Sequence, residues 1–146
     1  MPAYENKRPG SVGALMVFLA IQALGAIAGG IGLVQDPVDN IGMPLDMLEG
    51  SPFSDYLFPG LILLIAVGLV PAVALFGVAR RRWWGWWLAV VAGAGLVIWI
   101  VTEVALLGYL PGAGLALQIG MGLLGVVILV CALVRPTRSH FGVSGH

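Results

Sequence analysis

The chain has 146 residues, of which 60% are hydrophobic and only 10% are charged, and its net charge is zero. Soluble proteins average about 25% charged residues, and a soluble core of this size could not hide so much apolar surface. A zero net charge also gives no electrostatic footprint for nucleic acid, so no nucleic-acid partner is expected.

Four long apolar runs fill almost the whole chain. Each has about 20 residues or more, which lets a helix cross a hydrocarbon core of roughly 30 Å. The second and third breaks are short, so consecutive helices must be antiparallel neighbours. The sequence therefore predicts an all-α membrane protein, an up-down-up-down bundle of four transmembrane helices in one domain. The predicted spans are 11–34, 57–79, 83–107 and 113–134, with an external loop over 35–56 and a cytoplasmic tail over 135–146.

Two residues near the middle of the first and second spans interrupt their apolar character. Gln22 lies in the first span, and Pro71 lies at nearly the same depth in the second. Proline cannot donate a backbone hydrogen bond, so Pro71 frees the carbonyl of Val67. We expect the Gln22 amide to donate to that carbonyl; the alternative is that Gln22 binds a substrate.

The loop over 35–56 combines five acidic residues with apolar ones. Its stretch from Pro44 to Gly50 is typical of one short amphipathic turn, with proline near its start and glycine past its end. We expect the loop to lie on the outer membrane surface or to fold over the bundle as a lid. Either a cap over the helix ends or a gate for a ligand fits this pattern. The apolar lid residues are Met43, Leu45, Met47, Leu48, Phe53 and Tyr56.

The basic residues predict the orientation of the bundle. All seven lie on one side of the predicted spans, whereas five of the seven acids lie in the opposite loop, 35–56. Lys and Arg favour the cytoplasmic side, so both termini are predicted to be cytoplasmic. Four tryptophans follow an arginine triplet, at the level where such rings prefer lipid headgroups. The basic residues are Lys7, Arg8, Arg80, Arg81, Arg82, Arg135 and Arg138, and the tryptophans are Trp83, Trp84, Trp86 and Trp87.

Glu103 is the only Asp, Glu, Lys, Arg or His inside the four runs. It lies five residues before Gly108, hence roughly 7–8 Å below the outer end of its helix. Gln118 lies at a similar depth in the next span, so the two side chains are expected to bond. Trp99, one turn below Glu103, would form the floor of a pocket there, with Thr102 beside it. Glu103 is either a proton or cation site or a structural partner of Gln118 and the lid.

Several kinds of chemistry have no residues to carry them. Both histidines, His140 and His146, are in the tail, which argues against bis-His haem or a His-based metal site within the bundle. The single cysteine, Cys131, cannot form an intrachain disulfide, which excludes the four-span quinone-linked thiol oxidases. Small multidrug exporters place their essential Glu in the first span, unlike this chain. No metal and no cofactor are expected.

The stretch SPFSDYLFPGL at 51–61 supplies a resemblance. With Gly93, Trp99, Glu103 and Gln118 downstream, it resembles a group of uncharacterised small four-span membrane proteins of bacteria, including actinobacteria. The similarity covers roughly residues 40–125. It implies the same architecture and brings no activity, cofactor or catalytic residue.

Three functions remain open from the sequence. The first is a non-enzymatic accessory module in a bacterial plasma membrane, which binds lipids, a membrane protein partner or a second copy of itself. The second is a small proton-coupled transporter that uses Glu103. The third is an enzyme acting on lipids, for which Glu103 is the only acid or base available. The scarcity of chemical groups favours the first.

Overall fold

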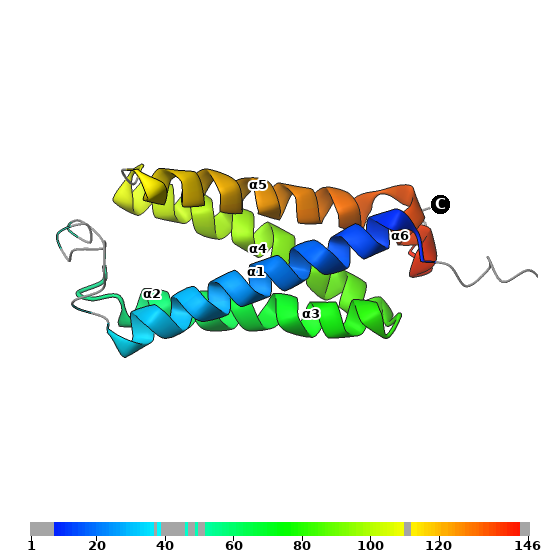
Figure 1. Ribbon diagram of the computed structural model, residues 1–146, viewed down its shortest axis with the longest axis horizontal. Coiled ribbons are helices and arrows are strands. Elements are labelled where there is room, and N and C mark those ends of the chain that lie inside the picture. Colours follow the sequence, from blue (N-terminus) through cyan, green and yellow to red (C-terminus); the bar gives the residue numbers. More distant parts are fainter. Residues whose placement is uncertain are drawn as a thin grey trace, which may run out of the picture.

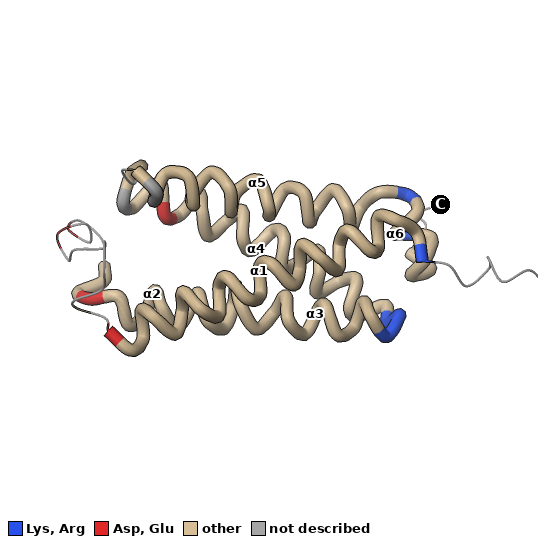
Figure 2. Tube along the Cα trace, viewed as in Figure 1, with Lys and Arg blue, Asp and Glu red and all other residues tan. Residues whose placement is uncertain are grey.

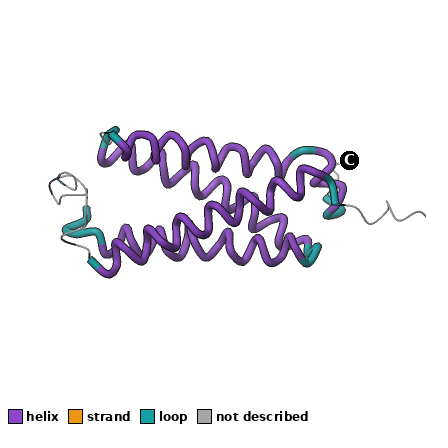
Figure 3. The backbone as a smooth tube through the Cα atoms, viewed as in Figure 1, coloured by secondary structure: helices purple, strands orange, loops and turns teal. Residues whose placement is uncertain are grey.

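The computed structural model describes residues 8–36, 38, 46, 49, 52–109 and 112–143. Within these residues the chain is helical and contains no strand (Figure 3). Its elements are α1 (Gly10–Gln35), α2 (Leu57–Ile62), the π-helix η3 (Leu63–Leu69), α3 (Val70–Ala79), α4 (Trp83–Leu107), α5 (Ala113–Leu133) and α6 (Arg135–His140).

Four helical stretches of the described chain are long and apolar enough to cross a membrane, as the sequence predicted. They are Gly10–Gln35, Leu57–Ala79, Trp83–Leu106 and Leu115–Leu133. Neighbouring spans run in opposite directions (Figure 1). The predicted limits agree with the helices to within one residue at each end.

The second span is not one continuous α-helix. It consists of α2, η3 and α3, and the amide of Val70 bonds the carbonyl of Ile65, five residues earlier. Pro71 follows directly and has no N–H to restore the ordinary spacing. The sequence predicted an interruption here, and the structure spreads it over one wide turn before the proline.

The spans pack as two helical hairpins that diverge toward one end. α1 packs along α2, η3, α3 and α5, while α4 packs along α3 and α5. In Figure 1, α4 and α5 lie above α1 and α2 on the left, and the helices converge on the right. Glycines set the closest approaches: a Cβ at Gly93 would lie 3.1 Å from the carbonyl oxygen of Gly125, so α4 and α5 touch there through their backbones.

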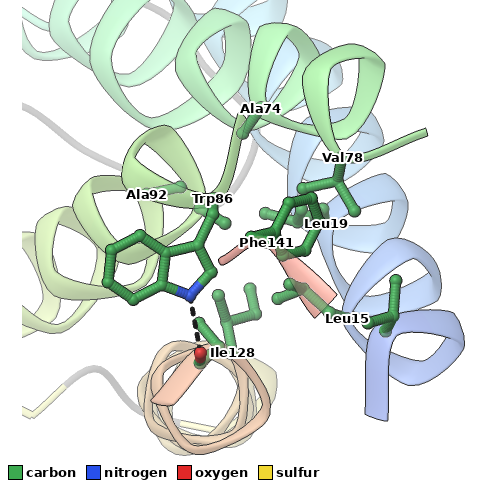
Figure 4. Packing of buried hydrophobic residues seen from close by; sticks show 11 residues of the cluster. Leu15, Leu19, Ala74, Val78, Trp86, Ala92, Ile128 and Phe141 are labelled. Carbon is green, nitrogen blue, oxygen red and sulfur yellow. Dashed lines mark hydrogen bonds between the residues drawn. The ribbon is translucent and has the colours of Figure 1, made fainter. Parts of the chain in front are cut away.

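The converging end holds the main core (Figure 4). Trp86 is only 5% exposed, and its indole N–H donates to the carbonyl of Ala132 at 2.7 Å. Trp83 and Trp87 are exposed. Trp86 therefore faces the bundle interior, whereas the level of the four tryptophans relative to the headgroups stays a prediction. The buried residues around it include Leu15, Leu19, Ala74, Val78, Ala92, Ile128 and Phe141.

The segment after the fourth span packs back onto the bundle. The Thr137 hydroxyl is fully buried; it donates to the carbonyl of Cys131 at 2.6 Å and lies 2.7 Å from the Ser11 hydroxyl. Phe141 joins the main core. The first part of the predicted tail, α6, therefore docks across the start of α1 and the end of α5.

Charge separates the two ends of the bundle (Figure 2). Among the described residues, every Arg lies at the converging end and every acid lies at the diverging end. We call these the basic end and the acidic end. The basic residues are Arg8, Arg80, Arg81, Arg82, Arg135 and Arg138; the acidic residues are Asp36, Asp46, Glu49, Asp55 and Glu103.

Candidate functional site

Glu103 and Gln118 meet near the acidic end. A tight turn joins α4 to α5, and Gly108 (φ 74°) and Gly112 (φ 61°) both adopt positive φ angles, which glycine tolerates best. The turn places the end of α4 beside the start of α5. The Gln118 amide N–H₂ donates to Glu103 Oε1 at 3.1 Å and to the carbonyl of Gly108 at 3.2 Å. The hydrogen bond predicted between Glu103 and Gln118 is therefore present.

Gln118 and Glu103 differ in their exposure. Gln118 is 4% exposed, whereas Glu103 is half-buried. Trp99 packs lower down, against a buried cluster of Ala26, Val67 and Leu96. Its predicted role as the floor of a pocket beside Glu103 stays a prediction.

Thr102 is exposed, although it directly precedes Glu103 on α4. Consecutive helical residues point in directions about 100° apart, so neighbours in sequence do not share a face. The expectation that Thr102 lies beside Glu103 in a pocket is corrected as regards burial. Thr102 is exposed, whereas Gln118 is buried and Trp99 is partly buried.

Tyr56 belongs to the other hairpin. It precedes α2, is 1% exposed, and forms a small core with Leu33 of α1, against which Phe53 also packs. Burial raises the pKa of the Tyr56 phenol, and the negative charges of Asp46 and Glu103 raise it further. The phenol is therefore neutral at pH 7 and lies within electrostatic range of a carboxyl on α4. We call Tyr56, Glu103 and Gln118 the acidic-end cluster.

The predicted lid is described only in part. Met43, Leu45, Met47 and Leu48 lie outside the described residues. The other two lid residues, Phe53 and Tyr56, pack against α1 and the second span, as expected for a segment that covers the bundle.

Gln22 forms a second polar site in the middle of the bundle. It is fully buried, and its amide N–H₂ donates to the carbonyl of Val67 at 3.3 Å and to that of Ala92 at 3.2 Å. The bond to Val67 confirms the prediction that Gln22 donates to the carbonyl that Pro71 leaves free. The second joins α1 to α4, and nothing in the sequence marked Ala92 as the partner. Gln22 Oε1 is buried and receives no hydrogen bond from the described residues.

The arrangement offers hydrogen bonding and one carboxyl. Within the described residues, no three His, Cys, Asp or Glu side chains are grouped so that they could hold a metal ion. Sequence reasoning found Glu103, Gln118 and Gln22, since polar groups in apolar runs are conspicuous, and it named Tyr56 only as an apolar residue of the lid. It did not foresee that the charge of Glu103 contributes to raising the pKa of Tyr56, because the two residues lie on different hairpins.

Comparison with known proteins adds no assignment. No protein-family model, no curated protein and no solved structure matches the chain. The functional conclusion therefore depends on the residues and their geometry.

Proposed function

We propose that this chain is a non-enzymatic, multi-pass membrane module that binds a partner protein or a lipid at its acidic end, as an accessory subunit does. The observation that carries the proposal is the use of three buried polar side chains within the spans, each of which joins one segment to another. Gln22 bonds η3 and α4, Trp86 bonds α5, and Gln118 bonds α4 and the turn after it. Side chains engaged in such hydrogen bonds stabilise the fold.

The acidic-end cluster is the favoured binding position. Here Tyr56 packs on Leu33 at the end of one hairpin, and Glu103 bonds Gln118 at the end of the other. Interhelical hydrogen bonds in membranes contribute only about 0.6 kcal/mol on average, so stability alone is a weak reason to place a carboxyl there. A partner that contacts this end supplies a stronger one.

Photo-crosslinking in native membranes tests the proposal. A photoreactive side chain at Tyr109, which is exposed beside the cluster, should give a discrete adduct with one protein or lipid. The matched position is Leu123, which is exposed in the middle of α5 and should give only diffuse lipid products. Glu103→Leu should reduce the Tyr109 adduct. Identical products at the two positions would contradict a binding site at the acidic end.

A proton-coupled transporter is the second candidate, and one observation favours it. Gln22 Oε1 is buried without a hydrogen bond next to an irregular second span, and transporters often place their sites at interrupted helices near the midplane. Purified protein in liposomes with a trapped pH-sensitive dye decides the matter. Proton flux above that of empty liposomes, lost in Glu103→Gln, would favour this candidate over the accessory module; we expect no such flux.

We also propose a location and an orientation. The charge asymmetry supports cytoplasmic termini in a bacterial plasma membrane, because the positive-inside rule applies to short loops such as Arg80–Arg82. The resemblance of 51–61 to small four-span bacterial membrane proteins supports the same assignment. Accessibility labelling of the two ends, described in the Discussion, is the corresponding test.

A further inference from the structure

A hollow of about 620 Å³ opens at the basic end, where α3 passes into α4. Phe76, Arg80, Arg81, Arg82 and Trp84 line it. The volume falls within the roughly 300–1,000 Å³ typical of small-molecule sites. We call it the basic hollow. It lies at the opposite end of the bundle from the acidic-end cluster.

The backbone fixes the three arginines in a tight turn. A Cβ at Gly77 would lie 2.6 Å from Gly85 Cα, so α3 and α4 are in direct contact beside the turn. The amide of Arg82 donates to the carbonyl of Gly77 at 2.8 Å, and that of Arg81 donates to Val78 at 3.1 Å. Arg81 has φ 57°, a conformation that glycine usually supplies at the end of a helix. An arginine at this position adds charge where the backbone favours a residue without a side chain.

Aromatic rings position the charged guanidinium group of Arg80. The Arg80 guanidinium carbon lies 5.0 Å from the centroid of the Phe76 ring, within cation–π range. Phe76 in turn stacks with Trp84, with ring centroids 6.5 Å apart and planes 30° apart. The guanidinium is therefore held over an aromatic surface at the edge of the span.

Several positive charges gather at the basic end. No Asp or Glu of the described residues lies at the basic end (Figure 2). The guanidinium of Arg8 adds a further positive charge, since it donates to the carbonyl of Ala79 at 2.7 Å. Guanidinium groups bind phosphate through paired hydrogen bonds, and clusters of them at a membrane surface attract anionic headgroups.

An apolar stripe continues from the basic hollow toward the middle of the bundle. Leu69, Val73 and Phe76 are all exposed and follow the spacing of one helical face. We propose that the basic hollow binds the phosphate headgroup of an anionic phospholipid, whose acyl chain lies along this stripe. The ligand is a lipid and not free phosphate, because the stripe offers the acyl chain a surface that free phosphate cannot use. The site is independent of the proposed function, which concerns the opposite end.

Native mass spectrometry of the detergent-solubilised full chain measures this binding. Phosphatidylglycerol should bind more tightly than phosphatidylcholine, and an excess of inorganic phosphate should leave it bound. Arg80→Gln and Arg82→Gln should each weaken phosphatidylglycerol binding by about fivefold, the effect of one charge at a membrane surface. Arg80→Lys keeps the charge but loses the planar donor group, and should also weaken it.

Arg135→Gln is the matched control. It removes one exposed positive charge from the same end, outside the basic hollow, and should leave phosphatidylglycerol binding nearly unchanged. An equal loss in Arg135→Gln would show that the attraction is diffuse and overturn the site. Equal binding of the two lipids would also overturn it, and displacement by inorganic phosphate would overturn the choice of a lipid.

Arg81→Gly separates binding from folding. Glycine suits the positive φ angle of this position, so the variant should unfold at the same temperature as the parent or higher. It should nevertheless bind phosphatidylglycerol about fivefold more weakly. Retained binding in this well-folded variant would contradict a role for the Arg81 side chain in the site.

Discussion

At the scale of single residues, the pairing of Glu103 with Gln118 explains how a carboxyl is accommodated inside a span. Gln118 donates to both Glu103 and the Gly108 carbonyl, so the acid shares its donor with the turn that ends α4. Half-burial leaves the carboxyl a route to the membrane surface, close to the end of its helix. The structure thus contains the hydrogen bond that a structural role of Glu103 requires.

Substitutions of Glu103 test the structural part of this account. Glu103→Gln should keep the fold, because glutamine retains the size and an oxygen that accepts from Gln118. Glu103→Leu should lower the free energy of unfolding by about 1–2 kcal/mol, since Gln118 loses one acceptor. Unfolding in mixed detergent micelles measures both. Thr102→Val, at an exposed neighbouring position, is the control and should change little. A Glu103→Leu variant as stable as the parent would show that the bond contributes nothing.

At the scale of elements, Gln22 and Pro71 form a coupled pair across α1 and the second span. Pro71 withholds the amide that would bond Val67, and Gln22 supplies a side-chain donor in its place. The same amide also donates to the carbonyl of Ala92, so Gln22 joins three spans through hydrogen bonds. Irregularity in η3 is thus compensated locally, as a membrane interior requires.

A double-mutant cycle measures this coupling. Gln22→Leu should destabilise the parent by about 1–3 kcal/mol, because buried carbonyls lose their donor. The loss should be smaller in a Pro71→Ala background, where the new backbone amide can bond Val67 itself. The unfolding free energies of the four variants give the interaction energy. Strictly additive effects would mean that Gln22 does not compensate for the proline.

The docking of α6 predicts a dependence of stability on pH. Burial, and then the positive charges of Arg81 and Arg8, lower the pKa of His140. His140 therefore binds a proton less readily in the folded state than in the unfolded chain, where the pKa of histidine is about 6.5. Stability should be complete above that pH and fall as the pH drops below it toward the folded-state pKa. Thermal unfolding across this range should show the slope in the parent and not in His140→Gln. A parent with no slope would contradict the assignment.

At the scale of the whole molecule, the separation of charge gives the bundle a direction. The described arginines and acids occupy opposite ends, which the packing of the hairpins keeps apart along the length of the spans (Figure 2). Such a bias disfavours insertion in both orientations, because the positive-inside rule acts on the sum of short loops. The acidic-end cluster and the basic hollow therefore face different sides of the membrane.

Cysteine labelling tests the direction. In a Cys131→Ala background, Ser54→Cys should react with a membrane-impermeant maleimide added to intact cells, whereas Ser139→Cys should react only after the membrane is opened. Both serines are exposed, at the acidic and basic ends respectively, so a difference reports sidedness and not burial. The reverse pattern would invert the proposed orientation.

The sequence was informative about the candidate site where a polar group stood alone in an apolar run. Glu103, Gln118 and Gln22 were found in this way, and their depths followed from helix geometry, so two of their bonds were predicted correctly. The same reasoning did not show that Thr102 is exposed and Trp86 is buried. Depth is a property of position along a helix, whereas burial depends on which face meets a neighbour.

The sequence by itself determined the number, limits and antiparallel order of the spans, together with their charge asymmetry. These follow from local constraints: the thickness of hydrocarbon, the need to satisfy backbone hydrogen bonds within it, and short connections. Only the tertiary structure decided that Trp86 points inward, that α6 docks on α1, and that Tyr56 is buried against Leu33. The physical reason is that helices apolar on every side carry no amphipathic signal to orient them. Their facing residues are selected by close packing at glycines such as Gly93 and Gly125, which involves pairs of residues far apart in the chain.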